Sequence, residues 1–133
     1  MMATTALTLA NFVAIGAGAA VGAWSRWGLS LWLNTGPDRF PVGTWVANLT
    51  GSYIIGLTLA FSLFHPDWPA HVRLFLVTGM LGALTTFSTF SAETFTFFEQ
   101  GRWSLGVIYA AVSLLGCLTM TALGWWTMQA IKG

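Results

Sequence analysis

The hydrophobic positions of this chain fall into four long segments, which are separated by short stretches rich in turn-forming residues. Each segment reaches the about 20 mostly apolar residues that a helix needs to cross a bilayer. The connecting stretches carry proline, glycine, Asn and Asp, which end helices and form turns. The pattern predicts an all-α membrane protein with one domain over residues 1–133 and four transmembrane helices, at about 7–33, 42–64, 70–98 and 103–131.

Composition sets the environment in which these helices must fold. Charged residues are 7% of the chain and hydrophobic residues 56%, too few charges to cover the surface of a soluble protein. We therefore expect a lipid bilayer to solvate much of the surface. The net charge of +1 is too small for a nucleic-acid partner. Residues 1–25 contain no Lys or Arg, which argues against a signal peptide and favours a retained first helix.

The sequence has no side-chain pattern that is typical of an enzyme. We find no nucleophile–base pair and no cluster of metal-ligating side chains, so no catalytic residues are expected. The single cysteine, Cys117, excludes an internal disulfide and a multi-cysteine metal site, and we interpret it as a small packing residue.

Positive charges are almost balanced between the two membrane faces that four spans define. One face carries three positive charges, those of Arg26, Arg39 and Arg102. The other face carries two, those of Arg73 and Lys132. Because the Lys/Arg bias sets orientation, this balance predicts insertion in both directions and an antiparallel, dual-topology homodimer. A weakly biased single orientation is the alternative. Gly18 and Gly22 add a small-xxx-small pair, which suits close helix packing without proving a dimer.

The third span departs from the pattern of an ordinary transmembrane helix. Two glycines, Gly79 and Gly82, are followed by five hydroxyl residues within positions 85–91. Gly, Ser and Thr are mediocre helix formers, and non-helical backbone at membrane depth survives only when protein or water covers it. We therefore predict a broken helix around Gly82 to Thr85, buried at a subunit interface. A break frees carbonyls that suit a bare cation such as Na⁺, and it starts a half-helix whose N-terminus favours an anion.

Polar and aromatic side chains near this break are candidates for an anion pathway. Phe87 and Phe90 share a helical face, and the positive edges of their rings could face a small anion. Core packing is the alternative interpretation of this pair. Asn48 lies inside the second span, with Ser52 one turn later, where an amide needs either a partner or a pathway.

The fourth span repeats the polar spacing of the second. Tyr109 and Ser113 lie one helical turn apart, and interhelical hydrogen bonding is the alternative for these residues as for Asn48. Arg26 and Glu93 are the charges that lie well away from the loops. Intramembrane charges are functional candidates, so a vestibule role is expected, with snorkelling to the interface as the alternative.

Three motifs resemble those of the Fluc (CrcB-type) fluoride channels. Residues 79–93 read GxxGxxTTFSTFSxE, which is similar to the third-helix signature of that family. Residues 43–52 read GTxxxNxxGS and resemble its second-helix motif, and residues 16–26 read GxGxxxGxxxR and resemble its first. The resemblance covers nearly the whole chain. Ala83 is one departure, because many relatives have a second glycine there.

The resemblance implies a dual-topology homodimer with two antiparallel pores and a central structural Na⁺ on the two-fold axis. By likeness, the Na⁺ ligands are the backbone carbonyls of Gly82 and Thr85, and the vestibule charges are Arg26 and Glu93. The implied anion pathway comprises the family's pore phenylalanines, its pore asparagine and its hydroxyl tracks: Phe87, Phe90, Asn48, Ser88, Thr89, Tyr109 and Ser113.

The expected function is a passive, selective fluoride channel in the inner membrane of a bacterium. Such a channel exports fluoride from the cytoplasm and protects the cell against fluoride toxicity. The main alternative is a small dual-topology, proton-coupled exporter of organic cations, which needs a deeply buried acidic residue. The first span offers Arg26 instead, and Glu93 lies toward the end of the third. A non-transporting membrane subunit is a further alternative, which leaves the polar third span unexplained.

Overall fold

The structure is a computed structural model that describes residues 6–36 and 39–132, and the regular elements of this part of the chain are all helices, with no strand among them. The all-α prediction is therefore confirmed for this part of the chain. The helices follow one another in the order α1 (Leu9–Leu33), α2 (Val42–Phe64), α3 (Ala70–Arg73), the π-helical η1 (Leu74–Leu81), α4 (Gly82–Leu84), α5 (Phe87–Glu99) and α6 (Trp103–Lys132).

Within residues 6–36 and 39–132, three helical stretches are long and apolar enough to cross a membrane. They are α2, the stretch Ala70–Glu99 that contains α3 to α5, and α6. Helix α1 has 25 residues, but Asn11 and Arg26 lower its apolar character. Its role as a fourth span therefore stays a prediction.

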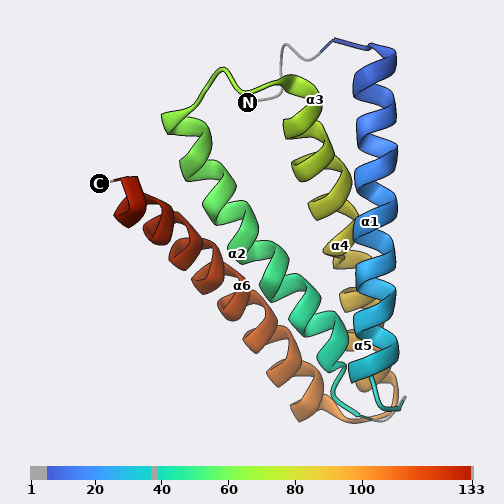
Figure 1. Cartoon of the computed structure of the whole chain (residues 1–133). Coiled ribbons are helices and arrows are strands. Elements are labelled where there is room, and N and C mark those ends of the chain that lie inside the picture. Colours follow the sequence, from blue (N-terminus) through green and yellow to red (C-terminus); the bar gives the residue numbers. More distant parts are fainter. Residues whose placement is uncertain (1–5, 37–38, 133) are drawn as a thin grey trace.

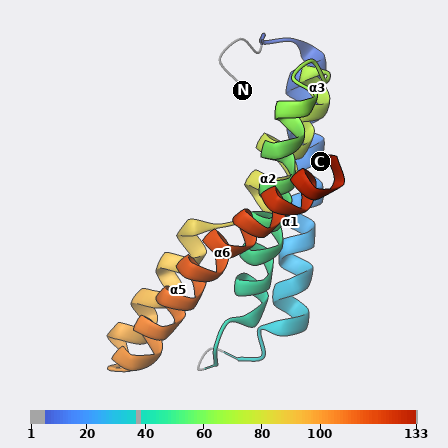
Figure 2. The ribbon, with the colours of Figure 1, turned by 90° about the vertical axis from the view of Figure 1, so that its left-hand side faces the viewer.

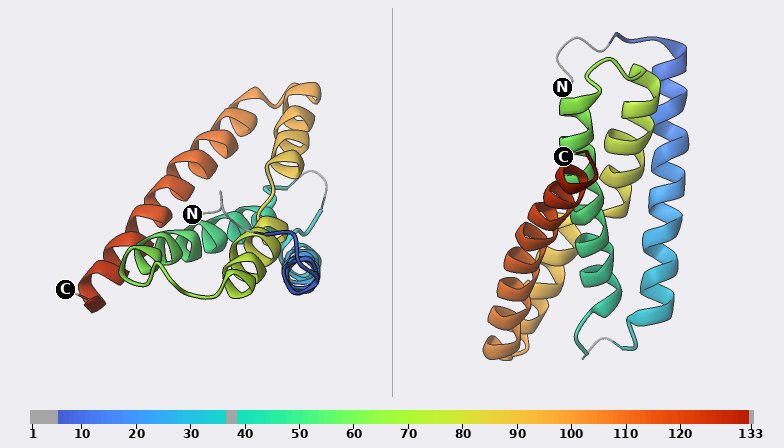
Figure 3. Two further views of the ribbon diagram at one scale, coloured as in Figure 1. Left: turned by 90° about the horizontal axis from the view of Figure 1, so that it is seen from above. Right: turned by 60° about the vertical axis from the view of Figure 1, so that its left-hand side comes forward.

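The third span changes partners along its length. Its first half, α3 to α4, lies beside α1, and α2 lies beside α6 (Figure 1). Its second half, α5, turns away from α1 and runs along α6 to the connecting loop (Figures 2 and 3). The bend between α4 and α5 places the polar middle of the third span beside a cavity that residues of α2 and α6 also line.

Glycines allow α1 and the third span to approach closely. A Cβ atom added to Gly18 would lie 2.2 Å from the carbonyl oxygen of Phe75, and one added to Gly22 would lie 2.1 Å from that of Met80. Gly79 approaches α1 in the same way from the other side. The small-xxx-small pair of the sequence thus packs helices within the protomer.

The pair formed by α2 and α6 uses the same device. A Cβ atom on Gly56 would lie 2.1 Å from the carbonyl oxygen of Thr121, and one on Gly124 would lie 2.1 Å from that of Tyr53. The Thr121 hydroxyl also donates to the carbonyl of Ser52 across the pair, at 3.1 Å. This interhelical bond satisfies a hydroxyl inside an apolar environment.

The helix break lies at Thr85 and Thr86. Their φ/ψ values are −89°/153° and −152°/123°, which are extended, whereas Gly82 is helical at −61°/−34°. The prediction of a broken helix is confirmed, but its position around Gly82 to Thr85 was wrong for all but the last residue. Tertiary hydrogen bonds explain the shift, because they hold the backbone at Ala83 and Thr86.

Candidate functional site

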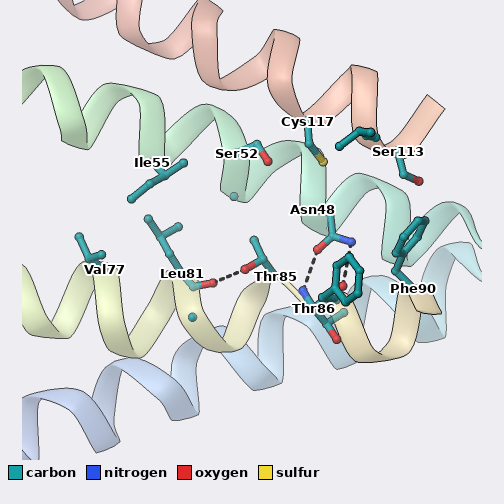
Figure 4. Close-up of a pocket in the computed structure, with 14 residues that line it drawn as sticks. Asn48, Ser52, Ile55, Val77, Leu81, Thr85, Thr86, Phe90, Ser113 and Cys117 are labelled. Atoms are coloured by element: carbon teal, nitrogen blue, oxygen red, sulfur yellow. Dashed lines mark hydrogen bonds between the residues drawn. The ribbon is translucent and has the colours of Figure 1, made fainter. Parts of the chain in front are cut away.

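A cavity of about 440 Å³ opens where the third span breaks, and we call it the break cavity (Figure 4). It lies between α2, the third span and α6. Its polar and aromatic lining includes most of the candidate residues, together with aliphatic side chains: Asn48, Gly51, Ser52, Ile55, Val77, Leu81, Gly82, Thr85, Thr86, Phe87, Phe90, Ser113, Leu114 and Cys117.

Asn48 holds the broken backbone from across the cavity. The N–H of Thr86 donates to Asn48 Oδ1 at 2.8 Å, and Asn48 Nδ2 donates to the Thr86 carbonyl at 3.2 Å. Figure 4 shows this side chain reaching from α2 to the extended segment. The amide thus acts as a neighbouring peptide would in a sheet. A carboxamide has two N–H donors, so the second can still donate into the cavity.

Thr86 begins the second half-helix. Its hydroxyl accepts a hydrogen bond from the N–H of Thr89 at 3.1 Å, which is the usual bond of a Thr N-cap. The Thr86 hydroxyl also lies 3.4 Å from that of Ser88. Because α5 begins at Phe87, the positive end of its dipole lies at the cavity wall.

The same bonds release two carbonyl groups from the helical ladder. In an unbroken helix the amides of Thr86 and Thr89 would donate to the carbonyls of Gly82 and Thr85, four residues earlier. Here those amides donate to side chains instead. Between them, the carbonyl of Ala83 accepts a hydrogen bond from Arg26 Nε at 3.0 Å.

These two carbonyls are candidates for holding a cation. The described residues contain no group of His, Cys, Asp or Glu side chains suited to a metal ion. Gly82 is exposed, and an added Cβ would come no closer than 3.7 Å to a neighbouring atom. The released oxygens of Gly82 and Thr85 are hard donors of the kind that Na⁺ prefers, so the residues fit the expected ion.

The two phenylalanines line the break cavity but differ in environment. Their ring centroids lie 5.6 Å apart in an edge-on arrangement. Phe90 packs against Tyr109, with centroids 5.2 Å apart, whereas Phe87 is 79% exposed. Core packing within the protomer therefore does not account for Phe87.

Ser113 lines the break cavity and carries a buried hydroxyl without a hydrogen-bond partner among the described residues. The residue is 6% exposed. A buried, unpaired hydroxyl costs free energy unless a ligand or water satisfies it. The Ser113 hydroxyl is therefore a candidate donor to an ion or a water molecule in the cavity.

Tyr109 lies behind the cavity wall and holds Glu93. Its hydroxyl donates to Glu93 Oε1 at 2.7 Å, and the Thr44 hydroxyl donates to Glu93 Oε2 at 3.0 Å. Tyr109 is fully buried among aromatic rings and lines neither the break cavity nor the second cavity described below. The structure therefore separates Tyr109 from Ser113, although they share one face of α6.

A second cavity of about 670 Å³ adjoins α5, and we call it the outer cavity. Of the candidates, Ser88, Thr89 and Glu93 line it. Arg26 lines neither cavity, since its guanidinium reaches Ala83. The remaining lining comes from the α1–α2 connection and α5: Asn34, Gly36, Arg39, Pro41, Ala92, Thr96 and Phe97.

Sequence reasoning missed Thr86 and Arg39, which line these cavities, and Thr44, which holds Glu93 in place. The Thr86 cap had a signal, because a threonine before a Phe-Ser-Thr run matches a helix start. Thr44 precedes Asn48 by four residues, which places both on one helical face. Arg39 gave no local signal beyond its charge.

Comparison with known proteins places the chain in a family. The sequence model described as CrcB-like protein, Camphor Resistance (CrcB), matches residues 13–125. A protein named fluoride-specific ion channel FluC from Thiobacillus denitrificans is 50% identical over 121 residues, which cover 91% of this chain and 98% of that protein. A Bordetella petrii protein of the same name is 50% identical over 129 residues, covering 97% and 99%. The chain belongs to the CrcB family.

Proposed function

We propose that the chain is a passive, selective fluoride channel that exports fluoride from the cytoplasm and protects the cell against it. The observation that carries this proposal is the break cavity, where an unpaired Ser113 hydroxyl, an Asn48 amide and two phenylalanine rings converge. The names of the relatives support fluoride as the ion. Nothing in this scheme requires an enzymatic step.

The chemistry of the cavity suits a small, strongly hydrated anion. Hydrogen bonds from Asn48 and Ser113 in the break cavity, and from the hydroxyls of Ser88 and Thr89 in the outer cavity, would replace part of the hydration shell. The N-terminus of α5 adds positive potential, and the ring edges of the phenylalanines add more without a fixed charge. Several moderate sites let the ion leave again, as conduction requires.

The proposal includes an antiparallel homodimer with two pores. Phe87 is 79% exposed on one protomer, and an aromatic ring with that exposure beside a polar cavity suits a partner surface. Arg26 and Tyr109 complete the proposed pathway indirectly, through Ala83 and Glu93. With α1 as a fourth span, each protomer would cross the inner membrane of a bacterium four times.

A structural Na⁺ on the two-fold axis is part of the same proposal. Each protomer would contribute the carbonyls of Gly82 and Thr85, so two copies would surround the ion with four oxygens. When bound, the ion supplies a fixed positive charge that ties the two breaks together. The side chains of Asn48 and Thr86 keep both carbonyls free of helical hydrogen bonds, because they bind the amides that would otherwise donate to these carbonyls.

The rival exporter would need Glu93 available to an organic cation. In the structure both Glu93 oxygens already accept hydrogen bonds, from Thr44 and Tyr109. Channel and exporter can also be separated by measurement, because coupled export requires a proton gradient and passive efflux does not.

Fluoride efflux from liposomes that contain only the purified protein tests the proposal. We expect fast efflux, measured with a fluoride electrode, with chloride retained and no need for a proton gradient. Phe87→Ile keeps an apolar side chain but removes the ring edge, so efflux should fall at least about tenfold. Absence of fluoride efflux from folded, inserted protein would reject the channel.

A further inference from the structure

The outer cavity contains a charge that the pathway described so far does not use. Arg39 lines this cavity, and it is the single cationic side chain among the described lining residues. It lies on the α1–α2 connection, where its backbone N–H donates to the Gly36 carbonyl at 3.2 Å. Ser88 and Thr89 line the same cavity from the first turn of α5.

A cation is needed here because the outer cavity also contains a carboxylate. Glu93 lines the wall and is fixed in place by the hydroxyls of Thr44 and Tyr109. A fixed carboxylate beside an anion path repels the anion, and the low dielectric of the protein strengthens that repulsion. A positive side chain in the same cavity offsets it.

The side chains of the other arginines near the pathway, Arg26 and Arg102, contact groups outside this role. Arg26 donates to the Ala83 carbonyl at the break. The guanidinium of Arg102 lies over the ring of Phe97, 5.4 Å from its centroid, and Arg102 does not line the outer cavity. Arg39 is therefore the guanidinium that an anion entering this cavity would meet.

We infer that Arg39 is an anion-recruiting residue, which offsets Glu93 and concentrates small anions at the Ser88 and Thr89 hydroxyls before they reach the break cavity. This inference rests on the proposed channel function. In an antiparallel dimer each membrane face would present one such cavity, so recruitment would act in both directions. Fields focused in a cleft raise the local concentration and on-rate of ions of the opposite sign.

A chemical probe measures the local field without relying on conduction. Thr96 lines the outer cavity and is exposed, so Thr96→Cys in a Cys117→Ser background gives one reactive thiol there. The rates of an anionic and a cationic methanethiosulfonate reagent are then compared. Arg39→Gln should lower the anionic-to-cationic rate ratio by roughly threefold to tenfold at low ionic strength, and Arg39→Lys should preserve it. An unchanged ratio in Arg39→Gln overturns the inference.

Fluoride efflux then tests whether the field serves permeation. Because the Debye length falls from about 30 Å at 0.01 M to about 3 Å at 1 M, a recruiting charge matters only at low ionic strength. With an impermeant organic salt, Arg39→Gln should slow efflux severalfold at low salt and match the wild type at high salt. Lys132→Gln, which removes an equal charge from the exposed end of α6, is the matched control and should leave efflux unchanged.

The two measurements separate the two ideas. If wild-type protein conducts but Arg39→Gln conducts equally at every ionic strength, Arg39 does not recruit anions. If wild-type protein conducts no fluoride, the proposed function fails, while the reagent ratio still decides whether Arg39 makes the outer cavity attractive to anions.

Discussion

At the scale of single residues, the unusual feature is that side chains replace backbone groups as hydrogen-bond partners at the helix break. The side-chain amide of Asn48 accepts a hydrogen bond from the N–H of Thr86 and donates one to the Thr86 carbonyl. The Thr86 hydroxyl accepts a hydrogen bond from the N–H of Thr89. Extended backbone inside a membrane protein is stable only when such partners are present. Asn48 therefore has two roles, as a support of the break and as a proposed donor to the anion.

Asn48→Ala is expected to destabilise the protein and to stop conduction. The substitution leaves the N–H and the carbonyl of Thr86 without their partner, at a cost of about 1–3 kcal/mol for each buried group. Thermal unfolding of purified protein measures the loss. Ser52→Ala, one turn later on α2 in the same cavity, is the control and should change stability little. Equal stability of the two variants would contradict the supporting role of Asn48.

Ser113→Ala should separate stability from function. Its hydroxyl is buried without a partner, so removal should leave the unfolding temperature unchanged or slightly higher. If the hydroxyl binds the anion, its loss forfeits a hydrogen bond to a charge, about 1.5–3 kcal/mol, and efflux should fall about tenfold or more. Normal efflux from Ser113→Ala liposomes would remove Ser113 from the pathway.

At the scale of elements, the crossings of the helices depend on glycine. The α1 crossing with the third span brings Gly18 and Gly22 against carbonyl groups, and the α2 crossing with α6 does the same with Gly56 and Gly124. Close crossing allows Arg26 to reach the Ala83 carbonyl from α1. The geometry of the break thus depends on how tightly α1 packs.

Gly22→Ala is expected to disrupt folding because its Cβ would lie 2.1 Å from the Met80 carbonyl oxygen. That oxygen belongs to the backbone and cannot move without shifting the helix. The yield of monodisperse protein in size-exclusion chromatography should fall sharply. Gly28→Ala on the same helix meets no atom within 4 Å and is the matched control. It should fold normally, with a gain of up to about 1 kcal/mol from helix propensity.

At the scale of the whole molecule, the proposed dimer would cover a surface that one protomer leaves exposed. Phe87 projects from the protomer, and Gly82 is exposed beside the released carbonyls. Both features lie on the break cavity and suit a second copy and a shared ion. The nearly balanced Lys and Arg residues allow that copy to be inverted.

Removal of Na⁺ should therefore weaken the proposed dimer. In buffer with a large organic cation in place of Na⁺, the unfolding temperature and the dimer fraction should both drop, since a ligand bound only to the native state stabilises it by mass action. Restoring Na⁺ should reverse the change, and K⁺ should be a poorer substitute. A dimer that is indifferent to Na⁺ argues against a cation at Gly82 and Thr85.

Much of this architecture could be predicted from local sequence, but the position of the break could not. The run of hydroxyl residues after Gly79 and Gly82 indicated a break correctly, because those residues support a helix poorly. The low helix propensity of Gly82 led to a predicted break that begins too early in the chain. Arg26 and Asn48, which lie 57 and 38 residues from their partners in the third span, fixed it at Thr85 and Thr86.

The sequence by itself determined the helices, three of the four predicted apolar spans, the broken third helix and the family, because those depend on composition and on patterns over a few turns. The tertiary structure decided which polar groups are bonded and which are left for a ligand. It placed Arg26 at the break, Arg39 in the outer cavity and Ser113 unpaired in the break cavity. Such assignments depend on how helices cross, and crossings bring together residues that no local pattern connects.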